Sequence, residues 1–152
     1  MTSGLLKTWQ KLSAKPGGAW LFSRIIGFKI PYTGSISPRV THLERGKAEV
    51  ILKDRRAVRN HLNSIHALAQ MNLAEFCTGL AMTTQLGDLG RAIVTELKIQ
   101  YLKKARGTLT AKCSCPPFQL IENLNLTLEA TLFDSQGDIV SKAQAEWRIS
   151  PK

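Results

Sequence analysis

One segment of the chain is apolar around nearly its whole circumference and yet carries a carboxylate. We expect a helix from about His66 to Thr84. Its apolar residues would occupy every side, so the pattern predicts a helix that is buried all round: they are Ala67, Leu68, Ala69, Met71, Leu73, Ala74, Phe76, Leu80, Ala81 and Met82. Its one acidic residue is Glu75. Because ionised carboxylates are rarely buried alone, Glu75 is predicted to have polar neighbours or to lie at the wall of a cavity.

The segments around this helix show the alternation of apolar and polar residues that is typical of β-strands. Residues 40–43 and 48–52 flank Glu44-Arg45-Gly46-Lys47, which predicts a hairpin with glycine in the turn. Strands are predicted after the helix at residues 93–102, 108–113, 124–132 and 139–149. The last strand is expected to direct five residues inward, namely Ile139, Ala143, Ala145, Trp147 and Ile149. An antiparallel sheet of five or six strands with one buried helix is an α+β architecture.

Two helical segments are predicted before the first hairpin. Apolar residues at helical spacing, Leu5, Leu6, Trp9 and Leu12, end at Pro16-Gly17-Gly18. The apolar stretch of residues 19–28 that follows is too short to cross a bilayer. At 152 residues the chain is expected to form a single structural domain, with residues 1–38 as a helical extension packed on a core formed by residues 39–152.

The formal net charge of +10 favours anionic partners over cationic ones. The densest basic clusters are residues 53–59 and 98–106, and neither is interleaved with aromatic residues as in proteins that bind single strands. We therefore expect no nucleic-acid partner. No apolar run approaches the ~20 residues of a membrane-spanning helix, so integral membrane association is not expected either.

The three cysteines, Cys77, Cys113 and Cys115, are an odd number, and no second Cys pair accompanies the C-x-C motif. This pattern fits neither a disulfide framework nor a structural zinc site, and no metal is expected. The N-terminal segment also lacks the features of a signal peptide. A cytoplasmic protein with reduced thiols is predicted.

Two motifs resemble the hotdog-fold acyl-CoA thioesterase superfamily, in particular its phenylacetate-pathway and 4-hydroxybenzoyl-CoA thioesterase branches. The first is Asn60-x5-His66-x8-Glu75. It is similar to a pattern in which Asn precedes a His-Gly-Gly at the helix start and an Asp or Glu follows on the helix. The second is IQYLKKARGTLTAKC, residues 99–113, similar to the strand-turn-strand whose basic turn lies near the coenzyme A phosphates. The resemblance covers about residues 39–149 and implies a curved, mostly antiparallel sheet around one long helix.

The resemblance also implies an activity, the hydrolysis of an acyl-CoA thioester. Glu75 would act as general base or nucleophile, Asn60 would orient water or the carbonyl, and the Ala67 amide would stabilise the oxyanion, while His66 would fix the helix start. The coenzyme A phosphates would meet a basic turn formed by Lys103, Lys104 and Arg106. No cofactor is implied beyond the coenzyme A of the substrate. The family's sites form across the interface of a homodimer or homotetramer, so Glu75 would face the Asn60 loop of the other copy.

Two departures from the family pattern keep other functions open. Ala67-Leu68 replaces Gly-Gly, which adds a methyl group where a thioester would approach, and Glu75 replaces the commoner Asp. A non-catalytic acyl-CoA or fatty-acyl binding protein on the same scaffold is therefore an alternative to the enzyme. Glu75 could also be structural, and Asn60 could simply cap a loop. A nucleic-acid or anionic-membrane binder ranks lowest, because the basic residues are scattered along the sequence.

Overall fold

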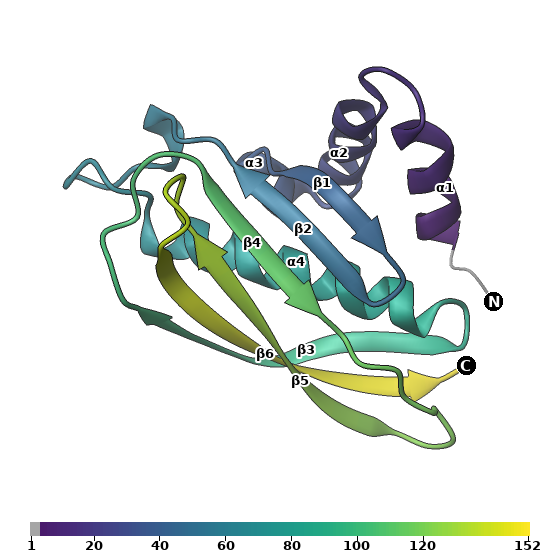
Figure 1. The fold of residues 1–152 in the computed structure, drawn as a ribbon. Helices are drawn as coiled ribbons and strands as arrows, with labels where there is room; N and C mark the ends of the chain where they lie inside the picture. Colours follow the sequence, from purple (N-terminus) through teal and green to yellow (C-terminus); the bar gives the residue numbers. More distant parts are fainter. Residues whose placement is uncertain (1–3) are drawn as a thin grey trace.

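The fold is built from three short helices, a hairpin, one long helix and four further strands. The computed structural model describes residues 4–152; the first three residues of the predicted N-terminal extension lie outside this range. The elements in chain order are α1 (Gly4–Ser13), α2 (Gly18–Lys29), α3 (Pro31–Ser35), β1 (Arg39–Glu44), β2 (Lys47–Leu52), the 3₁₀ turn η1 (Arg56–Val58), α4 (Ala67–Leu86), β3 (Gly90–Tyr101), β4 (Leu109–Ser114), β5 (Leu124–Phe133) and β6 (Ile139–Pro151) (Figure 1).

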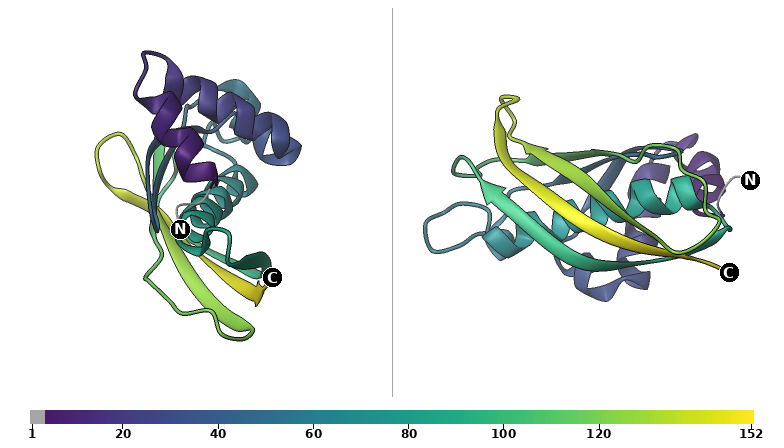
Figure 2. Two further views of the ribbon diagram at one scale, coloured as in Figure 1. Left: turned by 90° about the vertical axis from the view of Figure 1, so that its right-hand side faces the viewer. Right: turned by 90° about the horizontal axis from the view of Figure 1, so that it is seen from below.

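The strands form one antiparallel sheet in the order β1-β2-β4-β5-β6-β3. The sheet curves around α4, which lies along its inner side (Figure 2). β1 and β3 are the two edges. Gly46 makes the β1–β2 turn with a φ of 73°, a left-handed conformation that favours glycine. The architecture confirms the expected α+β class and the hotdog fold.

The predicted helix is present, but it is not buried all round. The side that faces the sheet contributes fully buried residues such as Leu73, Ala81 and Met82. Along the opposite side runs a stripe of incompletely buried residues, mostly four positions apart: Ala67, Leu68, Met71, Glu75, Gly79 and Thr83. Leu68 is 63% exposed. Glu75 therefore lies on the one side of α4 that the sheet leaves uncovered, which explains how the carboxylate is accommodated.

The N-terminal helices pack on the sheet edge formed by β1 and on α4 (Figure 2). The rings of Trp9 and Phe22 pack in a T-shaped arrangement with 5.1 Å between ring centroids, and both side chains are buried. Ser23 Oγ accepts a hydrogen bond of 2.9 Å from the Val40 amide, which joins α2 to the start of β1. No helix within residues 4–152 is long and apolar enough to cross a membrane.

The last strand departs from prediction at its first residue. Ala143, Ala145, Trp147 and Ile149 are buried as expected, but Ile139 is 38% exposed. Val140 and Ser141 are instead both fully buried. The β5–β6 register shifts between Leu132 and Phe133, so strict alternation fails at this end of β6. The inward position predicted for Ile139 was therefore wrong.

Candidate functional site

Asn60 organises the loop that leads into α4. Its Oδ1 accepts hydrogen bonds from the amides of Leu62 (2.9 Å) and Ser64 (3.1 Å). The backbone of Asn60 also donates to the Ser64 carbonyl at 2.8 Å. Asn63 takes a positive φ of 55° to complete the turn. Asn60 thus caps its own loop through Oδ1, while its side chain also lines a cavity at the helix start.

His66 and Ala67 form the start of α4. His66 is the N-cap residue, and its Nδ1 accepts a hydrogen bond of 3.1 Å from the Leu68 amide. His66 thus caps the first turn of α4. Ala67 is the first residue of the helix, so its amide is among those that lack a partner within the helix and carry the positive end of the helix dipole.

The helix-start cavity, about 360 Å³ in volume, brings four of the predicted site residues together: Asn60, Ala67, Lys103 and Lys104. The loop and the β3–β4 connection meet here because the Ile65 amide donates to the Ala105 carbonyl at 2.7 Å. The two sequence motifs, far apart in the chain, therefore share one cavity.

Three further polar residues, for which the sequence predicted no role, also line this cavity. Gln70 is buried, donates from Nε2 to the Ile65 carbonyl (3.0 Å) and accepts at Oε1 from Ser141 Oγ (2.9 Å). The Tyr101 hydroxyl donates to the Ala67 carbonyl at 2.9 Å, and burial raises the pKa of Tyr101. Ser64 Oγ is buried and has no partner among the described residues. Gln70 stands in a mostly apolar stretch of α4, a pattern that could have marked it, whereas Ser64 and Tyr101 have no comparable sequence signal.

The three basic residues of the β3–β4 turn differ in their surroundings. Lys103 Nζ contacts two carboxylates, Asp134 at 2.8 Å and Asp138 at 2.6 Å, and these hydrogen bonds raise the pKa of Lys103. Its charge is thus largely neutralised. Lys104 and Arg106 are exposed, and among the described residues neither makes an ion pair. Phosphate recognition in this turn would therefore depend on Lys104 and Arg106 rather than on Lys103.

Glu75 lies in a second cavity, which we call the Glu75 cavity, of about 300 Å³. Its other lining residues are mostly apolar and come from α1, α2, α3, α4 and β6: Leu5, Ile26, Ile30, Thr33, Phe76, Gly79, Leu80, Thr83 and Trp147. The Trp147 Nε1 group is buried and lacks a hydrogen-bond partner among the described residues. The cavity therefore combines an apolar wall with one carboxylate.

The Glu75 carboxylate has no ion-pair or hydrogen-bond partner among residues 4–152. Partial burial raises the pKa of Glu75, because the charged form loses solvation without gaining a compensating contact. An unpartnered carboxylate with a raised pKa is suited to accepting a proton from water near neutral pH. Perturbed carboxylates of this kind cluster at functional sites.

Within one chain the two cavities are separate. Glu75 lies eight residues after Ala67 on α4, which places it about 12 Å further along the helix axis. Asn60 and Ala67 line the helix-start cavity and Glu75 lines the Glu75 cavity. His66 lines a third cavity, beside Tyr32 and Asn72, so the structure does not bring the predicted residues together in one place.

Comparison with solved structures supports the hotdog fold. A structural-genomics protein is 28% identical with a TM-score of 0.83, covering 97% of this chain and 99% of its own. A protein of unknown function and probable thioesterase from Pseudomonas aeruginosa is 20% identical with a TM-score of 0.76, covering 86% and 93%. The phenylacetic acid degradation protein PaaI from Thermus thermophilus is 18% identical with a TM-score of 0.66, covering 78% and 97%.

The search among curated protein sequences gives no match. A family model matches residues 18–149. This range includes α2, the sheet up to Ile149, and the two parts of α4 that line the helix-start cavity and the cavity of Glu75. The chain therefore belongs to the family described as "Domain of unknown function (DUF4442)".

Proposed function

We propose that this protein hydrolyses an acyl-CoA thioester, with Glu75 as general base or nucleophile. The observation that carries the proposal is the half-buried Glu75, which has a raised pKa and no described partner in an apolar cavity on the central helix of a hotdog fold. Solved structures of the same fold include proteins described as thioesterases. The similarity to these structures indicates a shared fold and nothing more. The proposed activity therefore depends on the chemistry of the cavities.

The reaction uses the residues in the following way. As a base, Glu75 removes a proton from water while the water oxygen attacks the thioester carbonyl carbon. The developing oxyanion is stabilised by the Ala67 amide at the positive end of α4. The carbon–sulfur bond then breaks, and the thiolate of coenzyme A takes up the proton. As a nucleophile, Glu75 would instead attack the carbonyl carbon itself, and the carbon–sulfur bond would break to release the thiolate of coenzyme A and leave a mixed anhydride. Water would then hydrolyse this anhydride to the free acid and regenerate Glu75.

The proposed site is shared between two copies of the chain, because Ala67 and Glu75 of one copy line different cavities. Pairing through β3 would supply the second copy. β3 is a free edge of the sheet, and its Ile93 and Leu97 are 64% and 38% exposed. An edge strand with exposed apolar side chains is a ready template for pairing with another chain. In such a homodimer Glu75 of one copy faces the Asn60 loop of the other.

The acyl group is assigned to the apolar side of the Glu75 cavity, formed by residues such as Ile26 and Phe76. The coenzyme A phosphates are assigned to Lys104 and Arg106, with Lys103 contributing less because it already contacts Asp134 and Asp138.

A second candidate function is acyl-CoA binding without turnover. The Ala67 side chain favours it, because the added methyl group lies where the thioester carbonyl would approach the helix start. The two functions share the ligand and differ only in the chemical step.

A panel of short, long and aromatic acyl-CoA thioesters tests both functions. Wild type is compared with Glu75→Gln and Glu75→Ala, and with Glu129→Gln as a control that removes an exposed carboxylate. We expect at least ~100-fold lower kcat/KM in both Glu75 variants, with the fold retained and the control unaffected. Saturable acyl-CoA binding without hydrolysis would favour the second candidate. Hydrolysis that survives in Glu75→Gln would exclude Glu75 as base or nucleophile.

A further inference from the structure

The outer face of α2 and α3 exposes large apolar side chains that the described part of the chain leaves uncovered. Phe28 is 87% exposed, Tyr32 72% and Trp20 55%. We call this surface the α2–α3 face; it consists of Trp20, Leu21, Ile25, Phe28, Ile30 and Tyr32. The opposite side of α2 buries Phe22 and Ile26 in the core. α2 is therefore apolar on both sides, which folding of this chain alone does not require.

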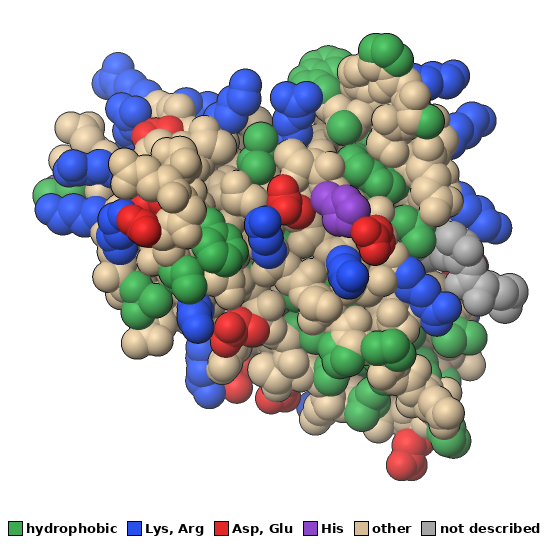
Figure 3. Space-filling view, viewed as in Figure 1, with side chains coloured by type: hydrophobic (Ala, Val, Ile, Leu, Met, Phe, Trp, Pro, Cys, Tyr) green, Lys and Arg blue, Asp and Glu red, His purple; other side chains and the backbone are tan. Residues whose placement is uncertain are grey.

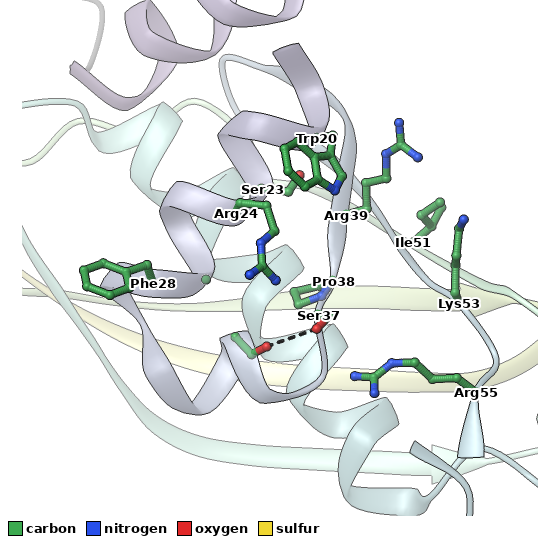
Figure 4. Close-up of a pocket in the computed structure, with 12 residues that line it drawn as sticks. Trp20, Ser23, Arg24, Phe28, Ser37, Pro38, Arg39, Ile51, Lys53 and Arg55 are labelled. Atoms are coloured by element: carbon green, nitrogen blue, oxygen red, sulfur yellow. Dashed lines mark hydrogen bonds between the residues drawn. The ribbon is translucent and has the colours of Figure 1, made fainter. Parts of the chain in front are cut away.

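Four basic residues gather beside this face in a cavity of about 620 Å³: Arg24, Arg39, Lys53 and Arg55. They come from α2, the start of β1 and the segment after β2. Trp20 and Phe28 line the same cavity, and no acidic residue of the described part of the chain does. Arg24 and Arg55 point toward Ser37 and Pro38 from opposite sides, while Arg39 and Lys53 extend outward (Figure 4).

The four charges are not neutralised. Among residues 4–152 none of them makes an ion pair, and the one described contact is a hydrogen bond of 3.1 Å from Arg55 Nη2 to the Ser35 carbonyl. These residues lie up to 31 positions apart in the sequence, so their basic character looks scattered there. Folding brings them to one side of the molecule, next to the exposed aromatic residues. In the space-filling view, hydrophobic side chains over the α1–α2 end are flanked by Lys and Arg (Figure 3).

The unpaired positive charges and the exposed apolar side chains of this surface together favour one kind of partner. Exposed aromatic and aliphatic side chains beside uncompensated cations are typical of helices that lie in the headgroup region of anionic membranes. A second copy of the chain would bring a matching set of positive charges and be repelled. We propose that the α2–α3 face docks on the surface of an anionic phospholipid bilayer, with a lipid phosphate between Arg24 and Arg55 and with Trp20 and Phe28 among the headgroups.

Docking in this orientation would also bring the Glu75 cavity near the bilayer. Ile30 belongs to the α2–α3 face and also lines the Glu75 cavity. The docking itself does not depend on the thioesterase activity, because its residues are separate from Glu75 and from the helix-start cavity.

Co-sedimentation of the full chain with vesicles tests this proposal. The probes are vesicles of phosphatidylcholine alone and of phosphatidylcholine mixed with phosphatidylglycerol. We expect binding to the mixed vesicles only, and weaker binding as sodium chloride is raised, because salt screens the attraction. Equal binding to both vesicles, or none to the mixed ones, would overturn the proposal.

Matched variants locate the surface. The double variant Arg24→Glu with Lys53→Glu should bind the mixed vesicles at least about tenfold more weakly. The control, Lys142→Glu with Arg148→Glu on β6, makes the same change in net charge and should bind nearly as wild type does. If both double variants lose binding equally, the attraction is a property of net charge and the proposed surface is wrong.

A second pair of variants tests how much the apolar side chains contribute to vesicle binding. Phe28→Ser should weaken binding by about tenfold, since it removes an apolar side chain from the lipid contact. The control Ile121→Ser changes a residue that is 84% exposed in the β4–β5 connection and should have little effect. Dissociation of an oligomer by Phe28→Ser would assign the face to a second copy. Release of the wild type from vesicles by inorganic phosphate at constant ionic strength would assign the cavity to a soluble phosphate. Either result would overturn docking on lipid.

Discussion

Ala67 and Glu75 lie two helical turns apart on the uncovered side of α4, and each lines a different cavity. A separation of about 12 Å is too large for one carbonyl group to contact both the Ala67 amide and the Glu75 carboxylate of the same helix. In the proposed reaction, another copy of the chain therefore supplies the missing half of the site. This relationship underlies the proposed shared site.

Replacing Glu75 with Gln should stabilise the protein near neutral pH. Partial burial raises the pKa of Glu75, so above the usual Glu pKa of about 4.3 the folded state binds more protons than the unfolded state. The stability of the wild type therefore falls as pH rises from that value through the folded pKa, and a neutral Gln escapes this loss. Urea unfolding at acidic and neutral pH measures the difference.

The control for that experiment is Glu129→Gln, which alters an exposed carboxylate and should change little. If Glu75→Gln is less stable than wild type at neutral pH, the carboxylate makes contacts that hold the fold together. Glu75 would then be structural.

Asp54 should stabilise the loop that precedes the helix-start cavity. It accepts hydrogen bonds from Arg59 Nε (2.6 Å) and from the Gly107 amide (2.9 Å), and these contacts, the Arg59 bond foremost, lower the pKa of Asp54. Asp54→Asn should cost about 1 kcal/mol in unfolding free energy. Because the pKa is lowered, this stabilisation is present above the unfolded pKa of about 3.9 and disappears as pH falls through the folded pKa.

Urea unfolding of Asp54→Asn, with the exposed Asp88→Asn as control, checks this prediction. A loss of the same size at all pH values would mean that packing, and not the carboxylate charge, is responsible.

Most of the secondary structure was predictable because each element packs one face against the rest of the protein. Alternation placed the strands and the hairpin turn at Gly46 correctly, and the apolar run placed α4 within two residues at its C-terminal end. The predicted burial was wrong at positions where the side chain is only partly packed against its neighbours. Leu68 is exposed on the uncovered side of α4, and Ile139 is exposed where the β5–β6 register shifts.

The sequence motifs could also predict only part of the candidate site. They singled out Asn60, Ala67 and Lys104, and the structure shows that these residues line one cavity, because they adjoin the helix start and the β3–β4 turn. Trp147 Nε1, which has no partner among the described residues, and the gathering of Arg24 with Arg55 depend on long-range packing. Local spacing carries no information about either.

The cysteines should be unreactive in the folded protein. Burial raises the pKa of Cys113 to about 12 and that of Cys115 to about 11, and it raises the pKa of Cys77 as well. The thiolate, which is the reactive form, is therefore scarce at mildly alkaline pH. A colorimetric disulfide reagent should label the native protein slowly and the urea-unfolded protein quickly. Rapid labelling of the native protein would contradict this prediction.

Ala67→Gly should increase turnover of thioesters. Removal of the methyl group lets a carbonyl approach the first amide of α4, and improved positioning should raise kcat/KM by about tenfold. Helix stability should fall by about 1 kcal/mol at most. Steady-state kinetics are compared with those of Ala57→Gly, which changes an exposed alanine in η1. Unchanged kcat/KM in Ala67→Gly would show that the methyl group does not obstruct the reaction.

The most direct test of the shared thioesterase site mixes two inactive variants. Asn60→Asp retains the Oδ1 acceptor that caps the loop but loses the amide donor, and Glu75→Gln removes the base. Each variant alone should hydrolyse acyl-CoA poorly. After unfolding and refolding together, the mixed dimers contain one intact Asn60–Glu75 pair across the interface, so activity should return. If the mixture stays as inactive as its components while mixed dimers are present, the site is not shared between copies. That result would contradict the proposed mechanism.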